Sequence, residues 1–414
     1  MTTSHAPRSR ALTAAASTAT LLGLAVTGAG PAQAVPIGAG CPALYVLGIQ
    51  GTGQSSVSAD PLADTGVLGA LIAPVLSAAP GLVQRSYIPY GAGFGGAVPG
   101  GSADPYYVSV AQARSALDAA VTQIVQACPA TMIAGVGYSQ GAHVISSFAR
   151  DVGAGDGPVA ADRVAGIALY AHPDRAPGSP TIPGRPGQIV PDPAPGTSGA
   201  AVATVRLTNP PAGGGGIADG AISYGALTGR VADICTDGDL ACSAPERAAL
   251  LRIGAEIAAQ ADLRDPFVAL GSLNEILKTA LGDAWTAILL NDFQVTVGNV
   301  DYLPRLDLAG RLIEAADPRT PAPTAADTGA ATARWAEITA TVAANPLLLG
   351  KLTGQLGAAW GQLAADNADL VNPAIWVRYA DTVARHNNYA TSGQLSSGIA
   401  WMVALAHDIS RSQS

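Results

Sequence analysis

The chain has 414 residues, of which 13% are charged and 49% are hydrophobic, so most of it is too apolar and too weakly charged to be a disordered protein. Its formal net charge is -8, from 22 basic and 30 acidic residues, and such a chain lacks the cationic surface that neutralises nucleic-acid phosphates. Nucleic acid is therefore excluded as an expected partner. The length is sufficient for two domains.

The first 34 residues have the pattern of a secretory signal peptide. Arg8 and Arg10 precede an apolar run over residues 11–29, and a small-x-small sequence, Ala-Gln-Ala, ends at Ala34. A membrane anchor is the alternative, but the run is rich in Ala, Thr and Gly, and the cleavage pattern follows it directly. We therefore expect cleavage after Ala34 and a secreted or cell-envelope protein. No later stretch is long and apolar enough for a transmembrane segment in the mature chain.

Short apolar segments alternate with helical patterns in the first half of the chain. Segments 43–49, 131–138, 164–170 and 202–207 have the composition of buried parallel strands. Between the first two, apolar residues at three- and four-residue spacings predict a helix over residues 107–127. This order of strands and helices is typical of an α/β fold.

The composition changes just after Cys242. All four cysteines lie in the first 242 residues, whereas every glutamate and every tryptophan follows them. The later half predicts helices, and Ser243, Pro245 and Glu246 have the spacing of a capping box at the start of the first one. We expect helices over residues 245–261, 266–281, 306–316, 328–344, 346–366, 374–384 and 393–411.

The even number of cysteines predicts two disulfide bonds in an exported chain. The four cysteines are Cys41, Cys128, Cys235 and Cys242, and they allow three pairings. Zinc is the alternative ligand, but the sequence has neither a Cys-x-x-Cys spacing nor paired histidines near these positions. We expect no metal and no cofactor.

The most specific local pattern is Gly-Tyr-Ser-Gln-Gly over residues 137–141. It follows a predicted strand and precedes a helical segment over residues 142–151, which is the context of a nucleophile elbow. The serine of such an elbow lies on a tight turn with its hydroxyl exposed, and the glycines on both sides let strand and helix approach closely. Ser139 is therefore the predicted nucleophile.

A serine nucleophile needs a histidine base and an acid that orients the base, and in this fold class they follow the serine in the order acid, histidine. His5 belongs to the predicted signal peptide, and His143 lies one helical turn after the serine, where we expect it to pack. His172 precedes any plausible acid, and His407 falls within the last predicted helix. We expect His386, in a loop-like break between two predicted helices, to be the base.

The predicted acid lies between the last two cysteines. Asp239 follows the last predicted strand, and a disulfide bond around it would fix the direction of its carboxylate. Asp237 is the alternative acid. Both residues are also compatible with an ordinary turn, but not with a calcium loop, because Glu246 does not have the spacing that such a loop requires.

These motifs together resemble the cutinase family of secreted α/β-hydrolase serine esterases. The similarity rests on residues 134–144 around the serine, on a Cys-Pro pair upstream, and on Cys-x-x-Gly-Asp-x-x-Cys over residues 235–242. It covers about residues 41–242 and continues from His386 onward. The resemblance implies a three-layer parallel sheet with Ser139 as nucleophile, Asp239 as acid and His386 as base, the last in a His-x-x-Tyr context with Tyr389.

The resemblance also implies the disulfide pairing and the oxyanion hole. The family pairs Cys41 with Cys128 and Cys235 with Cys242. Its oxyanion hole combines the backbone N–H of the residue after the nucleophile, here Gln140, with a hydroxyl residue after the first strand, here Thr52. Two such donors contribute about 3 kcal/mol each to transition-state stabilisation. The sequence departs from the family at Gln50, where arginine is usual.

A larger departure is the distance between acid and base, since 147 positions separate Asp239 from His386. We expect a signal peptide over residues 1–34, a cutinase-like core over 35–242, a helical insertion over 243–380, and a final segment, 381–414, that returns to the core with the histidine loop and a C-terminal helix. The insertion is expected to cap the active site and to line an acyl-chain groove. The alternative is a stabilising or partner-binding domain.

The enlarged plan resembles cutinase-like esterases of mycolate-bearing bacteria, including trehalose dimycolate hydrolases. The expected activity is therefore hydrolysis of lipid esters of the cell envelope by an exported enzyme, with the lipid layer itself as a partner surface. One alternative is a lipase or cutinase that acts on external triacylglycerol or polyester, and acyl transfer to a sugar would use the same site. The other is a non-catalytic envelope protein that binds lipid or a partner.

Overall fold

The computed structural model describes residues 34–209, 211–218 and 223–414. The predicted signal peptide lies outside the described residues except for Ala34, so its cleavage stays a prediction. Within the described ranges, no helix is long and apolar enough to cross a membrane.

Five parallel strands form one sheet in the order β2-β1-β3-β4-β5. Their bounds are β1 Leu44–Ile49, β2 Val83–Tyr87, β3 Met132–Tyr138, β4 Val164–Tyr170 and β5 Val231–Ile234. Strands β1, β3 and β4 are buried along their whole length and confirm three of the predicted segments. Because all strands are parallel, their carboxyl ends lie along one edge of the sheet, where ligands bind in open α/β folds.

The two outer strands were not predicted from the sequence, and one predicted strand is wrong. Strands β2 and β5 are short and carry polar residues, so neither forms the continuous apolar run expected of a buried strand. Segment 202–207 instead contains a 3-10 turn, Val202–Thr204. The Asp408 carboxylate accepts hydrogen bonds from the N–H groups of Ala201 and Val202 at 2.9 Å, which favours a turn over a strand at this point.

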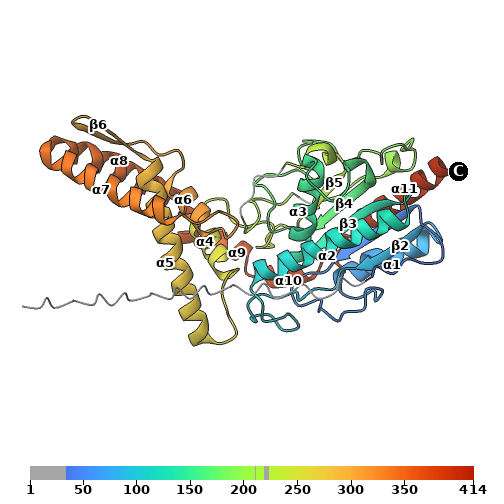
Figure 1. Cartoon of the computed structure of the whole chain (residues 1–414). Coiled ribbons are helices and arrows are strands. Elements are labelled where there is room, and N and C mark those ends of the chain that lie inside the picture. The colour runs from blue at the N-terminus through green and yellow to red at the C-terminus, as the bar shows by residue number, and fades with distance from the viewer. Residues whose placement is uncertain (1–33, 210, 219–222) are drawn as a thin grey trace, which may run out of the picture. The chain divides into compact units, whose positions relative to one another are not determined.

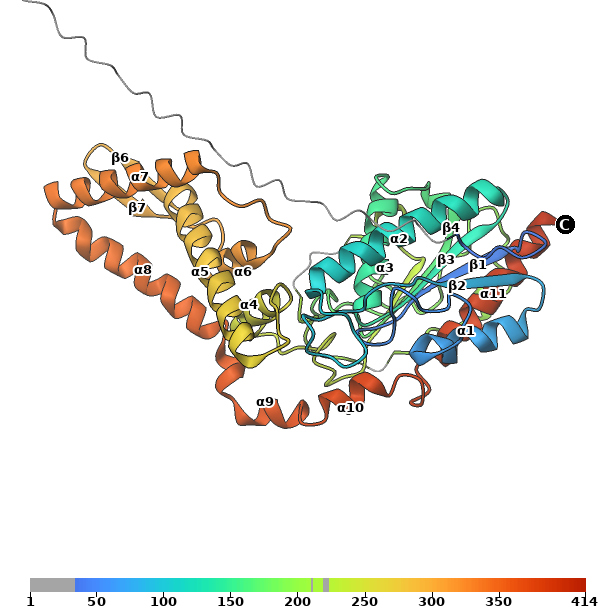
Figure 2. The same cartoon turned by 60° about the horizontal axis from the view of Figure 1, so that its bottom comes forward.

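Helices cover both faces of this sheet (Figures 1 and 2). Helices α1 (Gly66–Ala78) and α11 (Ser396–Gln413) share one apolar cluster with one face. Helices α2 (Tyr106–Ala127) and α3 (Gln140–Ala154) share a second cluster with the other face. The result is the expected three-layer α/β architecture, and α2 confirms the helix predicted over residues 107–127.

The chain between β5 and α11 is largely helical, as the sequence predicted. Its elements are α4 Ala249–Ala258, α5 Pro266–Asn291, α6 Leu308–Ala316, α7 Ala325–Ala344, α8 Leu347–Ala365, α9 Pro373–Arg378 and α10 Thr382–Asn387. We refer to residues 249–387 as the helical region. It also contains an antiparallel hairpin of β6 (Phe293–Thr296) and β7 (Asn299–Tyr302).

Three details of this region differ from the prediction. Helix α5 continues to Asn291, ten residues beyond its expected end. The helix expected over residues 374–384 is divided into α9 and α10, and α10 includes His386, for which the sequence predicts a loop-like break. The capping box is wrong as well, because the hydroxyl of Ser243 donates to the carbonyl of Gly213 and α4 begins only at Ala249.

Candidate active site

Ser139 lies on a strained turn between β3 and α3. Its φ of 53° and ψ of -121° belong to a region that non-glycine residues rarely adopt. The turn needs both flanking glycines: a Cβ on Gly137 would lie 2.6 Å from the carbonyl oxygen of Gly141, and a Cβ on Gly141 would lie 1.9 Å from the carbonyl oxygen of Ile49. The Gly-x-Ser-x-Gly pattern is therefore required by the close approach of β1, β3 and α3.

The structure brings the three predicted catalytic side chains together. His386 Nε2 lies 2.9 Å from Ser139 Oγ, and His386 Nδ1 lies 2.9 Å and 3.0 Å from the two carboxylate oxygens of Asp239. An ionised carboxylate only accepts hydrogen bonds, so Nδ1 carries the ring hydrogen and Nε2 is free to accept the hydroxyl proton of Ser139. This is the arrangement in which a histidine can act as the general base of a serine.

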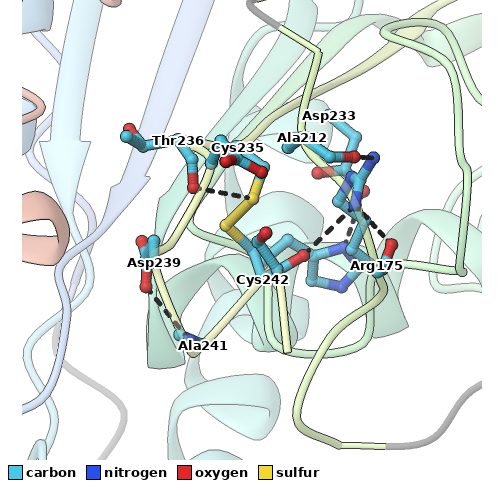
Figure 3. The surroundings of a disulfide bond; sticks show 12 residues. Arg175, Ala212, Asp233, Cys235, Thr236, Asp239, Ala241 and Cys242 are labelled. Carbon is cyan, nitrogen blue, oxygen red and sulfur yellow. Dashed lines mark hydrogen bonds and ion pairs between the residues drawn. A yellow bond between two sulfur atoms is a disulfide. The ribbon is translucent and has the colours of Figure 1, made fainter. Parts of the chain in front are cut away.

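The loop around Asp239 holds its carboxylate in a fixed direction. Besides His386, Oδ1 accepts a hydrogen bond from the N–H of Ala241 at 3.0 Å, and Oδ2 accepts one from the hydroxyl of Tyr389 at 3.0 Å. The disulfide bond Cys235–Cys242 closes this loop (Figure 3). Asp239 itself is fully buried.

Both expected disulfide bonds are present. Cys235 pairs with Cys242, and Cys41 pairs with Cys128, which confirms the pairing that the family resemblance implied. Arg175 supports the first of these from the side opposite Asp239, because its buried guanidinium donates to the carbonyl of Cys242 at 3.2 Å (Figure 3). The second bond ties the chain just before β1 to the end of α2.

Asp237, the alternative acid, binds a different partner. Its carboxylate accepts hydrogen bonds from the guanidinium of Arg378, one of them at 3.0 Å, and from the N–H of Gly213 at 3.0 Å. Burial alone would raise the pKa of Asp237, but these donors hold it below its usual range. The geometry therefore places Asp239, and not Asp237, beside the imidazole of His386.

The remaining histidines of the core do not contact the serine hydroxyl. His143 packs as expected: its Nδ1 lies 3.0 Å from the hydroxyl of Tyr106, and burial lowers its pKa to about 4, so it is neutral at physiological pH. His172 has an aspartate partner that the sequence reasoning did not assign, since its Nδ1 lies 2.9 Å from Asp233. His172 follows β4 and Asp233 lies in the adjacent strand β5. Their pairing depends on β5, which the sequence did not predict. His407 lies in α11, as predicted.

The two positions expected to form an oxyanion hole lie after β3 and after β1, in two turns that approach each other at Ser139. Gln140 is the first residue of α3, so its backbone N–H has no partner within the helix. Its buried side chain is occupied elsewhere, donating to the carbonyl of Gly93 at 2.9 Å. A Cβ on Gly51, the residue before Thr52, would lie 3.2 Å from Ser139 Cβ. The turn that carries Thr52 therefore passes close to the nucleophile.

Gln50 replaces the arginine that is usual in the family. Its side-chain amide donates to the carbonyl of Thr65 at 2.5 Å, and its backbone carbonyl accepts a hydrogen bond from the hydroxyl of Tyr90 at 2.6 Å. The glutamine is buried and joins the end of β1 to the residue before α1. The turn that carries Thr52 thus has support from its own polar contacts.

No group of three or more His, Cys, Asp or Glu side chains in the described part of the chain is arranged to hold a metal ion. At the carboxyl edge of the sheet, a serine hydroxyl, an imidazole and a carboxylate follow one another within hydrogen-bond distance.

Comparisons with known proteins found one family and several similar proteins. A family model described as Cutinase matches residues 40–250. A protein named carboxylesterase Culp6 homolog, from Corynebacterium glutamicum, is 30% identical over 226 residues, which is 50% of this chain and 66% of that protein. The chain thus spans just under two thirds of the length of this relative.

Similar solved structures are more distant. The catalytic core domain of acetyl xylan esterase from Trichoderma reesei is 21% identical, with a TM-score of 0.35 over 57% of this chain and 99% of that one. Lysin B from Mycobacteriophage D29 is 20% identical, with a TM-score of 0.34 over 54% and 75% of the two chains. A Trichoderma reesei cutinase in complex with a phosphonate inhibitor is 16% identical, with a TM-score of 0.30 over 56% and 77%.

Proposed function

The chain belongs to the cutinase family, and from this premise we propose that it is a serine esterase that cleaves carboxylic esters through an acyl-enzyme. The observation that carries the proposal is the pair of contacts made by His386, one to Ser139 Oγ at 2.9 Å and one to Asp239 at 2.9 Å. A carboxylate, an imidazole and a serine hydroxyl joined in this order are what acyl transfer at a serine requires.

The proposed reaction has two halves. Ser139 Oγ attacks the ester carbonyl while its proton moves to His386 Nε2, and Asp239 stabilises the imidazolium that forms. The backbone N–H of Gln140 and the donor at Thr52 stabilise the tetrahedral oxyanion, at about 3 kcal/mol for each donor. The imidazolium then protonates the departing alcohol. Water attacks the acyl-enzyme by the same route and releases the acid.

We propose that the substrate is a lipid ester of the cell envelope, such as a trehalose mycolate, and that the protein is exported to reach it. The support is the surface of the helical region, which exposes large apolar side chains far more than the core does. Phe267 is 85% exposed, Leu347 86% and Trp360 68%. In the core the comparable side chains are few and scattered.

One stripe of α5 illustrates this surface. Leu277, Leu281 and Trp285 follow one another at intervals of four residues, so they share a face of the helix, and each is about half exposed. Trp285 also packs edge-on against Trp335 of α7, with 5.4 Å between ring centroids. Indole rings favour the boundary between water and lipid because they combine a large apolar surface with one polar N–H. We infer that this stripe contacts the lipid layer.

We further propose that residues 243–380 form an insertion that shelters the acyl chain, between a core over 35–242 and a final segment over 381–414. The support is the order of the elements along the chain, because the helical region begins after Asp239 and its last helix, α10, contains His386. A segment fixed at both ends to one active site is suited to cover it.

Hydrolysis by the purified, oxidised chain tests the proposal. We expect cleavage of a short nitrophenyl ester, and faster cleavage of a trehalose mycolate than of a triacylglycerol presented in the same vesicles. Ser139→Ala should lower the rates on all three substrates by at least about 10³-fold, because it removes the nucleophile. Preference for the triacylglycerol would favour an external lipase or cutinase. A folded chain that cleaves none of the three would favour a non-catalytic envelope protein.

A further inference from the structure

We propose that Tyr138 and Tyr389 are positioning residues of this active site, whose hydroxyl groups hold the backbone of His386 and the carboxylate of Asp239. The inference rests on the proposed function and adds to it two residues that touch neither the substrate nor the transferred proton.

Tyr138 holds His386 from the side of the core. Its hydroxyl donates a hydrogen bond to the backbone carbonyl of His386 at 2.5 Å, and its ring lies 5.3 Å from the imidazole, tilted by 31°. Tyr138 directly precedes Ser139 at the end of β3. Two consecutive core residues therefore contact His386. Tyr138 binds its backbone carbonyl, and Ser139 contacts its imidazole ring.

Tyr389 holds the acid and lies three residues after the base. Its fully buried hydroxyl donates to Asp239 Oδ2 at 3.0 Å and accepts a hydrogen bond from the N–H of Thr236 at 2.8 Å. Cys242 Sγ also lies 3.5 Å from this hydroxyl. The same side chain thus joins the segment that carries His386 to both ends of the disulfide loop that carries Asp239.

The segment around His386 needs such contacts because its own helix provides little packing. Helix α10 has six residues, and none of them is buried. His386 follows Asp239 by 147 positions, so chain continuity does not fix the distance between base and acid. A displacement of roughly 1 Å at a catalytic group lowers the rate by about 10²-fold, so the site requires specific anchors.

Both phenols remain hydrogen-bond donors at any pH at which an esterase works. Burial, and secondarily the negative charge of Asp239, raises the pKa of Tyr138. The same two causes, in the same order, raise the pKa of Tyr389 well above its ordinary value. A protonated hydroxyl can donate to a carbonyl or a carboxylate, whereas a phenolate cannot.

A third tyrosine provides a matched control. Tyr170 is fully buried in the same aromatic group, with its ring 6.3 Å from that of Tyr389. Its hydroxyl has no hydrogen-bond partner among the described residues. Replacing any of the three with phenylalanine removes one buried hydroxyl and keeps the ring, so the three variants differ mainly in whether the lost hydroxyl holds a catalytic residue.

The test compares Tyr138→Phe, Tyr389→Phe and Tyr170→Phe on a soluble nitrophenyl ester. Active sites are titrated with a fluorophosphonate at saturation, so that kcat refers to folded sites even if a variant folds incompletely. We expect kcat to fall about 10-fold in Tyr138→Phe and about 10- to 100-fold in Tyr389→Phe with KM unchanged, because hydrogen bonds involving charged groups contribute most. Tyr170→Phe should stay within about twofold of the wild type.

Two results would overturn the inference and leave the proposed esterase intact. One is an active wild type whose Tyr138→Phe and Tyr389→Phe variants keep kcat within about twofold. The other is an equal loss in all three variants, which would show that any buried hydroxyl of this group acts through general stability. A wild type without activity would instead contradict the proposed function itself.

Discussion

The α/β core and the helical region bury their apolar side chains to very different extents. In the core, two large clusters enclose a sheet whose three central strands have no exposed residue. In the helical region the clusters are small, and α9 and α10 contribute no buried residue. Packing of the core therefore fixes Ser139, whereas Asp239 is held by its disulfide loop and His386 depends on individual hydrogen bonds.

Polar contacts between ionisable side chains join the two regions. Glu256 of α4 accepts a hydrogen bond from the hydroxyl of Tyr107 in α2. Arg319, between α6 and α7, lies over the ring of the same tyrosine, with 5.7 Å to its centroid, and reaches Asp174 at 4.0 Å. These contacts are charged or ionisable, so we expect the attachment of the helical region to be more sensitive to pH than the core.

The largest effect should distinguish the pair His386–Asp239 from the pair His172–Asp233. His386→Ala removes the pair that contacts Ser139, and we expect kcat to fall by about 10⁴-fold or more. His172→Ala removes the pair buried in the core and should lower the melting temperature, because it leaves Asp233 without its partner, while folded sites keep their kcat. Kinetics on a soluble ester with active-site titration measures both. The reverse pattern would make His172 the base.

The next effect compares two aspartates of one disulfide loop. Asp239→Asn should lower kcat by about 10³- to 10⁴-fold, because the imidazole loses the carboxylate that orients it. Asp237→Asn should leave kcat within about threefold, since it loses only the ion pair with Arg378, which is partly exposed. Steady-state kinetics at one pH is sufficient. Equal losses in the two variants would contradict the assignment of Asp239 as the acid.

The two disulfide bonds should separate stability from activity. Removing Cys41–Cys128, which spans 87 positions, should lower the free energy of unfolding by about 4 to 5 kcal/mol, against about 2 to 3 kcal/mol for the 7 positions of Cys235–Cys242. The shorter loop carries Asp239, so its loss should reduce kcat more. Urea unfolding and ester kinetics of the two double serine variants measure this. A larger loss of kcat in the Cys41 and Cys128 variant would contradict it.

The attachment through Glu256 should make stability depend on pH. Burial raises the pKa of Glu256 to about 7, so between about pH 4.5 and 7 the native chain holds a proton that the unfolded chain has released. The free energy of unfolding therefore falls by on the order of 3 kcal/mol in all as the pH rises through this range. Above this range Glu256 causes no further change.

Glu256→Gln tests this dependence because a glutamine keeps the shape and cannot ionise. Relative to wild type, the variant should gain thermal stability as the pH rises from 5 to 8. Glu337→Gln, at an exposed carboxylate of α7, serves as the control and should show no such trend. Parallel pH curves for wild type and Glu256→Gln would contradict the expectation.

The smallest effect concerns the exposed stripe of the helical region. Trp285→Ser should reduce hydrolysis of lipid esters in vesicles by several-fold, since burying the exposed half of the indole at a lipid boundary contributes about 1 kcal/mol. Its rate on a soluble nitrophenyl ester should not change. Val57→Ser, at a 71% exposed side chain of the core, is the matched control. Equal losses on both substrates would indicate a structural role for Trp285.

The sequence predicted those parts of the fold in which local pattern and final packing agree. The central strands are continuous apolar runs. Ser139 lies in a motif whose two glycines are required because they approach the backbone of α3 and of β1 closely. Residues 202–207 show the opposite case, because a short apolar run predicts a strand there while Asp408, some 200 positions away, holds the backbone in a turn. Such distant partners leave no local pattern.

Partners that are distant in the sequence also limit how much of the active site the sequence predicts. Motifs and chain order predicted the nucleophile, the acid and the base, and the family resemblance implied the pairing of the cysteines. It gave no role to Tyr138 and Tyr389, whose hydroxyl groups act on residues 248 and 150 positions away. Nor did it reveal the pairing of His172 with Asp233, which depends on the order of strands in the sheet.

The central claim is that Ser139, activated by a histidine at the far end of the helical region, is the nucleophile. Reaction of the folded, oxidised chain with a fluorophosphonate, followed by intact mass and peptide mapping, tests it most directly. We predict one adduct per chain, located on Ser139, that is absent in Ser139→Ala and forms at least about 10²-fold more slowly in His386→Ala. A folded chain that forms no adduct, or forms it on another residue, would contradict the claim.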